Sequence, residues 1–256
     1  MKKIKIGSFN TWNNVINRRG ITFNVEVLSQ VIKEENFDII GTQELTLKYC
    51  NELRKGLSNY SFCGNYRFGD FIFKKFSFNE NNSIITNKKV LFHKTIHLPF
   101  MPVNLRELKR ATSIKRWSLL PRIATLVVIE INNKHICMIN THLDYKITSI
   151  KKRQLSSLKK VIKNYIKEYP VILTGDFNLG IDEAVFNDFI FDLDKLGMMR
   201  VNISDSTWNC RGKNKKTLDH IFVPKTWKVL NCGVIENDMM DDISDHRMIY
   251  AECEIK

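Results

Sequence analysis

Polar side chains stand at the ends of several short apolar runs in this sequence. Asn10, Glu44 and His142 each follow a run of strand-forming residues. The same arrangement recurs at Asp176, Asn178, Asp219, Asp245 and His246. Carboxylate and amide oxygens are the ligands that Mg²⁺ and Mn²⁺ prefer, and an imidazole can transfer a proton near neutral pH. Together these residue types match the hydrolysis of a phosphoester by metal-assisted attack of water.

The set as a whole supports this chemistry, because each member alone is weak. A single Asp at a strand end is most often a turn former or a helix cap, and a lone His is more often structural. Strand ends that repeatedly carry an acid, an amide or an imidazole favour one shared site on short loops. Asp176 beside Asn178 can orient and deprotonate a water. The sequence has no evident Ser or Cys nucleophile beside a base, so direct attack by water is favoured over a covalent intermediate.

The elements that must position these residues are short strands and a few amphipathic helices. Apolar residues that alternate or run together predict strands, and apolar residues three and four apart predict helices. The predicted strands are 3–9, 38–41, 70–78, 83–86, 122–131, 134–141, 171–175, 218–223, 229–235 and 247–254. The predicted helices are 22–35, 48–57, 149–167 and 182–196.

The order of these elements predicts an α/β fold. Asn132-Asn133 lies between two long strand runs, where a tight hairpin prefers such a dipeptide, and this implies antiparallel sheet. Strands arrive both in hairpins and in β-α-β order, which suggests stacked sheets flanked by helices. We expect a single domain over residues 1–256 without a flexible linker. Residues 99–121 are irregular and basic, and they predict an insertion loop beside the substrate face.

Composition limits the kind of protein. The 256 residues are 43% hydrophobic, and 40 Lys and Arg outnumber 27 Asp and Glu to give a formal charge of +13. This charge attracts polyanions, although a solvated lysine-rich surface explains it equally well. No run reaches the roughly 20 apolar residues that cross a bilayer, and no secretory signal is visible, so we expect a cytoplasmic monomer without a membrane anchor. Six dispersed cysteines argue against a zinc ribbon and are expected to be buried thiols.

Eight segments together resemble the endonuclease/exonuclease/phosphatase superfamily, the group with the fold of pancreatic deoxyribonuclease. The segments are Ser8-Phe9-Asn10-Thr11-Trp12, Gly41-Thr42-Gln43-Glu44, Glu80-Asn81-Asn82-Ser83-Ile84-Ile85, Pro121-Arg122-Ile123-Ala124-Thr125, Asn140-Thr141-His142-Leu143-Asp144, Gly175-Asp176-Phe177-Asn178, Leu218-Asp219-His220-Ile221-Phe222 and Ser244-Asp245-His246. The resemblance covers essentially the whole chain. It implies a four-layer α/β sandwich, with two packed, mainly antiparallel β-sheets flanked by helices, and metal-dependent cleavage of a phosphoester.

The resemblance also implies roles for the residues at matching positions. Glu44 would be the principal ligand of Mg²⁺, for which Mn²⁺ substitutes, and Asn10 would support the metal. Asp245 would be a further metal contact. Asp176 and Asn178 would position the attacking water and the phosphate.

Two histidines receive roles by the same resemblance. His246 would stabilise the phosphoryl transition state or act as a base, polarised by Asp219. His142 would be the acid for the leaving group, held by Glu80 as in the members that have this pair. His220 stands where many relatives carry Tyr, so the rim of the site is expected to differ there.

Several residues are candidates for substrate contact. Trp208 could stack on a base or a sugar, and a core position is the equal alternative. The other candidates are Asn82, Arg122, Lys213, Lys215 and Lys216. Lys151-Lys152-Arg153 opens the longest predicted helix and is expected to form its solvated face, with a phosphate track as the alternative.

These observations predict a phosphodiesterase that cleaves nucleic acid with low sequence specificity. The alternative is an enzyme that acts on a small phosphoester, an inositol phosphate or a phospholipid headgroup. A catalytically inactive nucleic-acid-binding module is disfavoured, because inactive relatives generally lose metal or imidazole positions that this sequence keeps.

Overall fold

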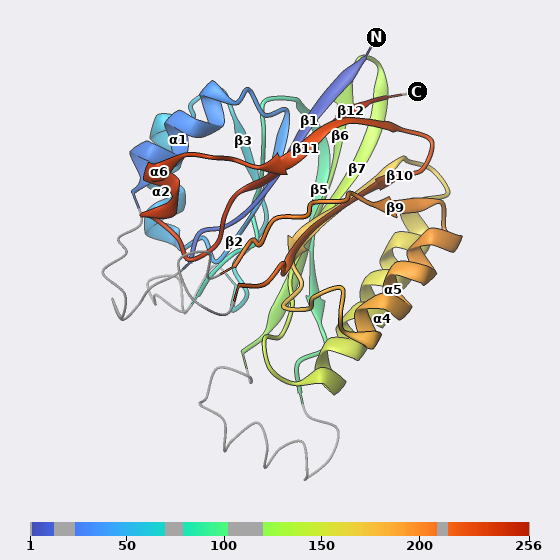
Figure 1. Cartoon of the computed structure of the whole chain (residues 1–256). Coiled ribbons are helices and arrows are strands. Elements are labelled where there is room, and N and C mark those ends of the chain that lie inside the picture. The colour runs from blue at the N-terminus through green and yellow to red at the C-terminus, as the bar shows by residue number, and fades with distance from the viewer. Residues whose placement is uncertain (1, 13–23, 70–78, 102–119, 209–214, 256) are drawn as a thin grey trace.

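Two six-stranded sheets form the centre of the computed structural model, which describes residues 2–12, 24–69, 79–101, 120–208 and 215–255 (Figure 1). The first sheet contains, in spatial order, β11 (Lys228–Val234), β12 (Ile249–Glu254), β1 (Lys3–Asn10), β2 (Ile39–Gln43), β4 (Ile84–Thr86) and β3 (Ser61–Cys63). The second contains β5 (Lys89–Leu98), β6 (Arg122–Ile131), β7 (Lys134–His142), β8 (Val171–Asp176), β10 (Asp219–Pro224) and β9 (Met198–Arg200). Only β1 with β2 and β7 with β8 pair in parallel among these strands; the other neighbours are antiparallel.

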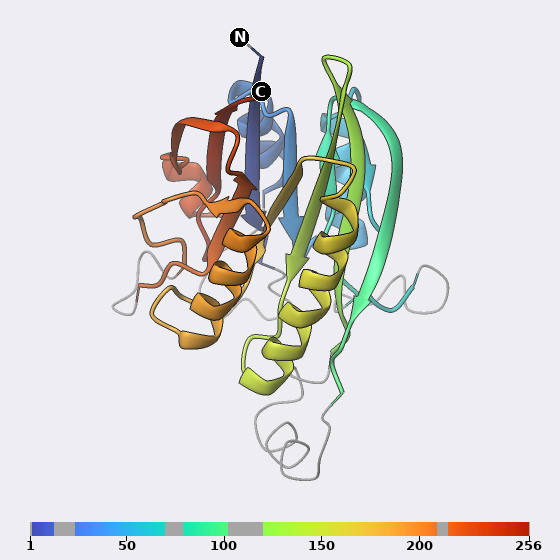
Figure 2. The same ribbon diagram turned by 90° about the vertical axis from the view of Figure 1, so that its right-hand side faces the viewer.

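Helices cover the outer face of each sheet and complete four layers (Figures 1 and 2). On the first sheet lie α1 (Val25–Glu34), α2 (Leu47–Gly56) and α6 (Asp238–Asp241). On the second lie α4 (Thr148–Tyr165) and α5 (Ala184–Lys195). Between the sheets, buried residues such as Ile6, Met138 and Ile172 form the central core. The four-layer α/β sandwich expected from the sequence is therefore confirmed.

Most of the predicted elements are present, and the predicted hairpin is among them. Asn132 and Asn133 have φ values of 51° and 62°, the left-handed backbone that a two-residue turn of this type requires. The predicted strand 70–78 and residues 102–119 of the predicted insertion loop lie outside the described residues. The three-residue strands β3 and β9 and the four-residue helix α6 were not predicted, because such short elements carry no detectable periodicity. The ten-residue strand β5 was also not predicted. It lies at a sheet edge with most of its residues exposed, so its sequence lacks a clean alternation of apolar and polar residues.

Burial agrees with the expectations for the thiols. Cys50, Cys63, Cys137 and Cys253 are buried, whereas Cys232 is half-buried. Cys210 lies outside the described residues. Across the described ranges, no helix combines the length and the apolar character needed to cross a bilayer.

The sheet topology brings the chemistry-bearing strand ends together. Because β1 and β2 run in parallel, Asn10 pairs with Gln43 and lies beside Glu44 at one sheet end. In the second sheet the register pairs Asp176 with His142 on one side. On its other side Asp176 pairs with Asp219. Parallel neighbours end at the same edge, so each sheet presents its polar residues on one rim.

Candidate active site

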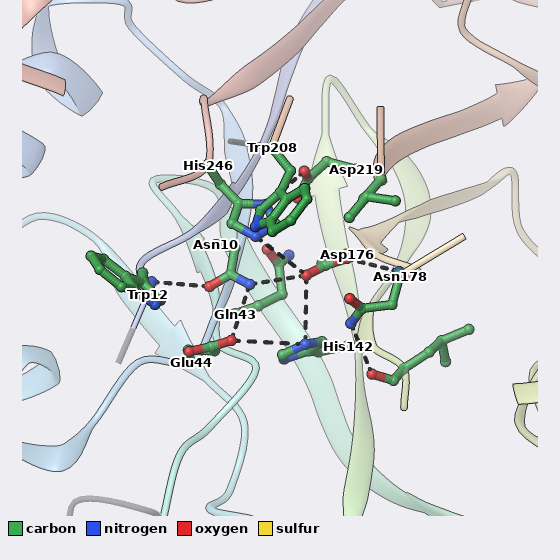
Figure 3. A network of polar contacts seen from close by, with 12 residues as sticks. Asn10, Trp12, Gln43, Glu44, His142, Asp176, Asn178, Trp208, Asp219 and His246 are labelled. Atoms are coloured by element: carbon green, nitrogen blue, oxygen red, sulfur yellow. Dashed lines mark hydrogen bonds and ion pairs between the residues drawn. The ribbon is translucent and has the colours of Figure 1, made fainter. Parts of the chain in front are cut away.

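The amide of Asn10 joins carboxylates from the two sheets (Figure 3). Its Nδ2 donates to Glu44 Oε1 at 3.2 Å and to Asp176 Oδ2 at 3.0 Å. Its Oδ1 accepts the backbone N–H of Trp12 at 3.0 Å, which fixes the orientation of the amide. Asn10 is 1% exposed, so this junction is buried at the centre of the site. The predicted proximity of Asn10, Glu44 and Asp176 is thus present.

A buried polar seam behind this junction fixes the separation of the sheets. Gln43 Nε2 of β2 donates to Asn140 Oδ1 of β7 at 2.7 Å, and Asn140 Nδ2 donates back to the Thr42 carbonyl at 2.9 Å. The close approach requires glycine at position 41, where an added Cβ would lie 2.5 Å from Asn140 Oδ1. Each sheet therefore delivers its carboxylate from a rigid support.

His246 and Asp219 form a buried pair. His246 Nδ1 lies 2.8 Å from Asp219 Oδ2, which also accepts the Thr207 hydroxyl at 2.6 Å. Burial lowers the pKa of the His246 imidazole, but the charges of Asp219 and Asp176 outweigh burial and raise it to about 10. His246 Nε2 faces Asp176 Oδ2 at 3.7 Å. An imidazolium at this place can donate a proton or stabilise a phosphoryl oxygen.

Asp176 ends β8 and begins a tight turn. Burial raises the pKa of its carboxyl to about 7, a rise that the His246 charge opposes and the Asp219 charge reinforces. Asp176 Oδ1 accepts the backbone N–H of Asn178 at 2.8 Å, and Asn178 adopts a left-handed φ of 50°. Asn178 Nδ2 donates to the Leu143 carbonyl at 3.2 Å. A carboxyl that titrates near neutral pH is well matched to accept a proton from water.

His142 is held by an arginine. Arg122 Nη1 donates to His142 Nδ1 at 3.0 Å, so Nδ1 is the acceptor and the ring proton resides on Nε2. Burial, together with the charges of Arg122, Arg67 and His246, lowers the pKa of His142 well below its usual value. His142 Nε2 faces Asp176 Oδ2 at 3.5 Å and Glu44 Oε1 at 3.9 Å. A neutral ring is a hydrogen-bond donor in this geometry, whereas the sequence-based hypothesis made it the leaving-group acid.

Glu80 has a different partner from the one expected. Its Oε2 lies 2.6 Å from Arg67 Nη2, and both side chains are buried. Within the described part of the chain, no hydrogen bond or ion pair joins Glu80 to His142. Arg122 occupies the Nδ1 side of the imidazole, which a supporting carboxylate would need.

The donor set fits a hard divalent cation. Carboxylate oxygens of Glu44 and Asp176, which come from different sheets, both accept from the Asn10 amide nitrogen. In the same network, Asp245 Oδ1 lies 3.9 Å from His246 Nε2. Like charges that converge in this way are stabilised by a cation with oxygen ligands. Ligand atoms of Asp176, Asp219 and His246 also lie within 4.8 Å of one another. Because Asp219 already binds His246 Nδ1, we interpret that trio as an Asp–His pair beside the cation site.

The predicted substrate residues divide into buried and exposed groups. Arg122 is buried against His142, and Asn82 is buried with its Nδ2 donating to the Ile123 carbonyl at 2.7 Å. Trp208 is half-buried, and its Nε1 donates to Asp245 Oδ2 at 3.1 Å. Lys215 and Lys216 are exposed. Lys213 lies outside the described residues.

Sequence reasoning missed several residues that support the site. Gln43 and Asn140 belong to the segments that carry the family resemblance, but nothing in the sequence indicated the hydrogen bond between their side chains across the two sheets. Arg67 gave no signal, because it stands outside every motif. Lys151 was expected on a solvated face, yet it is 5% exposed and its Nζ donates to the Asn178 carbonyl at 2.6 Å.

Solved structures similar to this chain share its fold. The endonuclease/exonuclease/phosphatase of Bacteroides vulgatus is 21% identical, with 100% of each chain covered and a TM-score of 0.78. A mannosyl-6-phosphatase of Bacteroides thetaiotaomicron is 20% identical over 98% of this chain and 100% of that one, with a TM-score of 0.76. TDP2 of D. rerio, complexed with a single-strand DNA product, is 18% identical over 99% of each chain, with a TM-score of 0.72. No curated protein sequence matches the chain.

A family model matches most of the chain. The model of the Endonuclease/Exonuclease/phosphatase family matches residues 21–246, which include Glu44, Asp176 and the Asp219–His246 pair. The resemblance inferred from the eight sequence segments is therefore confirmed. The chain belongs to the endonuclease/exonuclease/phosphatase family, whose members hydrolyse phosphoric esters.

Proposed function

We propose that this protein is a Mg²⁺-dependent phosphodiesterase that cleaves nucleic acid by direct attack of water, with Mn²⁺ as a substitute metal. The observation that carries the proposal is the junction at Asn10, where carboxylates of Glu44 and Asp176 meet within hydrogen-bond distance of one amide. The protonated His246 faces the same Asp176 oxygen. This combination supports the assignment of a cation site, a proton acceptor and a proton donor to one buried centre.

Glu44 and Asp245 would hold the cation, and Asn10 would keep the carboxylates in place. The bound cation would neutralise the charge that develops on the phosphoryl oxygens. Trp208 supports this arrangement through its indole N–H, which restrains Asp245.

The proton transfers are assigned to residues of this chain. Asp176 accepts a proton from the attacking water as the new P–O bond forms, and Asn178 orients that water. His246 donates its Nε2 proton to the departing ester oxygen as the old P–O bond breaks. His142 donates a hydrogen bond from Nε2 to a phosphoryl oxygen. The proton taken up by Asp176 then returns to His246 through solvent, which restores both groups.

Nucleic acid as the substrate is supported by charge and by the rim of the site. The chain has a formal charge of +13, and such a charge favours polyanions. Lys215 and Lys216 are exposed, and the backbone of Lys216 pairs with that of Trp208 next to the site. Among the similar structures, TDP2 was solved with a single-strand DNA product.

A small phosphomonoester is the second candidate, and two buried arginines favour it. Arg67 and Arg122 are 4% and 7% exposed, and the charge of each lowers the pKa of His142. Guanidinium groups suit the extra negative charge of a terminal phosphate. One of the similar structures is a mannosyl-6-phosphatase.

The test compares wild type with Asp176→Ala on one substrate panel with Mg²⁺, Mn²⁺ or EDTA. The panel contains plasmid DNA, single-stranded DNA, RNA, bis-p-nitrophenyl phosphate, inositol phosphates and a sugar phosphate. Metal-dependent cleavage of nucleic acid that falls at least about 10²-fold in the variant supports the proposal. Turnover of monoesters alone supports the second candidate, and binding of nucleic acid without any turnover would show a catalytically inactive module.

A further inference from the structure

Lys151 is a buried cation beside the site that the proposed chemistry has not used. It lies in the first turn of α4 and is 5% exposed, although lysine is almost never fully buried without a partner. Its Nζ donates to the backbone carbonyl of Asn178 at 2.6 Å. The next residue, Lys152, is exposed, so burial is specific to Lys151 and does not extend to the whole basic run.

The carbonyl that Lys151 binds belongs to a strained turn. Asn178 has a φ of 50°, in the left-handed region that residues other than glycine adopt only uncommonly. Such a conformation persists when surrounding contacts determine it. Two of these contacts come from Asp176 and Leu143, which accept the backbone and side-chain N–H groups of Asn178. Lys151 supplies the contact on the carbonyl side.

Three carboxylates near Lys151 favour its charged form. Burial lowers the pKa of Lys151, Lys216 lowers it further, and the carboxylates of Glu183, Asp144 and Asp176 oppose this lowering. A charged donor makes a hydrogen bond roughly twice as strong as a neutral one. The helix therefore holds the turn with a strong, directional contact rather than with packing alone.

We propose that Lys151 is a positioning residue for hydrolysis, which fixes the turn at Asn178 so that the Asn178 side chain and the Asp176 carboxylate keep their places. This inference rests on the proposed function. It predicts that loss of the ammonium lowers kcat more than it changes KM, because the contact orients reacting groups and does not itself bind substrate.

The experiment compares wild type, Lys151→Met, Lys151→Arg and the matched control Lys152→Met, with bis-p-nitrophenyl phosphate and Mg²⁺. We expect Lys151→Met to lose at least about 10-fold in kcat with KM changed by less than about 2-fold, since small misplacements reach about 10² in rate. Lys151→Arg retains a donor and should recover most of kcat, and Lys152→Met should match wild type. Circular dichroism verifies that each variant is folded at the assay temperature.

Hydrogen exchange of the Asn178 backbone amide provides a readout that is independent of activity. Faster exchange in Lys151→Met, with wild-type rates in Lys151→Arg and Lys152→Met, supports the inference even if no substrate is turned over. Unchanged kcat and unchanged exchange in folded Lys151→Met would overturn it. If Lys151→Met does not fold, loss of kcat and of exchange protection in folded Lys151→Arg would overturn it. Inactive wild type with the expected exchange pattern would instead contradict the proposed function alone.

Discussion

Substitution of Asp219 by Asn tests the protonation of His246. Asp219 is fully buried and accepts from His246 Nδ1 at 2.8 Å. Burial lowers the pKa of that imidazole, but Asp219, as the largest of the opposing causes, helps to raise it to about 10. At pH 8 such a group is about 99% protonated, whereas a histidine with the ordinary pKa of about 6.5 is about 3% protonated. Because His246 donates a proton in the proposed reaction, Asp219→Asn should lower turnover at pH 8 by about 30-fold. This figure takes the ordinary pKa for the variant, in which the charge of Asp176 still raises the pKa of His246 and burial still lowers it.

The pH dependence separates this cause from a general loss of structure. At pH 6 an ordinary histidine is about 76% protonated, so the protonation effect should nearly vanish there. The assay is the initial rate of bis-p-nitrophenyl phosphate hydrolysis at both pH values, with saturating Mg²⁺. Asp194→Asn is the matched control, since that carboxylate is exposed on α5 and pairs with Lys225. An equal loss at pH 6 and pH 8, or full activity at pH 8, would refute the reasoning.

Three further predictions concern the metal, the backbone and stability. Removal of metal with EDTA should abolish turnover, and Glu44→Gln should raise the Mg²⁺ concentration for half-maximal rate at least about 10-fold, as measured by metal titration; an unchanged requirement would contradict the ligand assignment. Gly175→Ala should lower the free energy of unfolding by about 2 kcal/mol or more, because its φ is 152° and an added Cβ would lie 2.1 Å from the Thr141 carbonyl oxygen. Gly197→Ala, at a φ of 80° with no atom within 4 Å, should cost only about 1 kcal/mol in the same urea titration, and equal costs would argue against the clash. In metal-free protein, His246 binds a proton more tightly when folded, so its stabilisation is complete below about pH 6.5 and is lost as the pH rises toward about 10, by up to about 1.4 kcal/mol per pH unit. His246→Gln should remove that slope in urea unfolding, and a slope that persists would contradict the raised pKa.

The main site residues could be predicted because of where their strands end. Asn10, Glu44, His142 and Asp176 follow apolar runs, and parallel pairing of β1 with β2 and of β7 with β8 places those run ends on one rim. The polar residues that follow these runs therefore indicated a shared site when they were taken together. The order of the motifs along the chain led to the family resemblance, and that resemblance implied the four-layer fold. The arrangement of helices and sheets confirms this fold (Figure 2).

The partners of these residues could not be predicted, because they depend on contacts between distant segments. Glu80 pairs with Arg67 and His142 contacts Arg122, and no local pattern encodes either choice. Lys151 illustrates a second cause. It belongs to a basic run that suggests a solvated face, yet successive helical residues point about 100° apart, so one member of the run can be buried while the next is exposed.

For Trp208 the sequence left open a role in substrate stacking and a position in the core, and the structure shows an intermediate case. Its ring is half-buried, and its indole N–H binds Asp245. The sequence could not reveal this contact, because it joins side chains 37 positions apart. A tryptophan in a loop gives no indication of whether its polar end faces substrate, solvent or another residue of the site.

The most direct test of the central claim measures hydrolysis of bis-p-nitrophenyl phosphate by wild type and Asp176→Ala, each with Mg²⁺ and with EDTA. The account predicts turnover by wild type that requires Mg²⁺, and a rate at least about 10²-fold lower for a folded Asp176→Ala protein. Equal rates for the two proteins, or turnover by wild type that survives EDTA, would contradict the assignment of metal-assisted hydrolysis to this site.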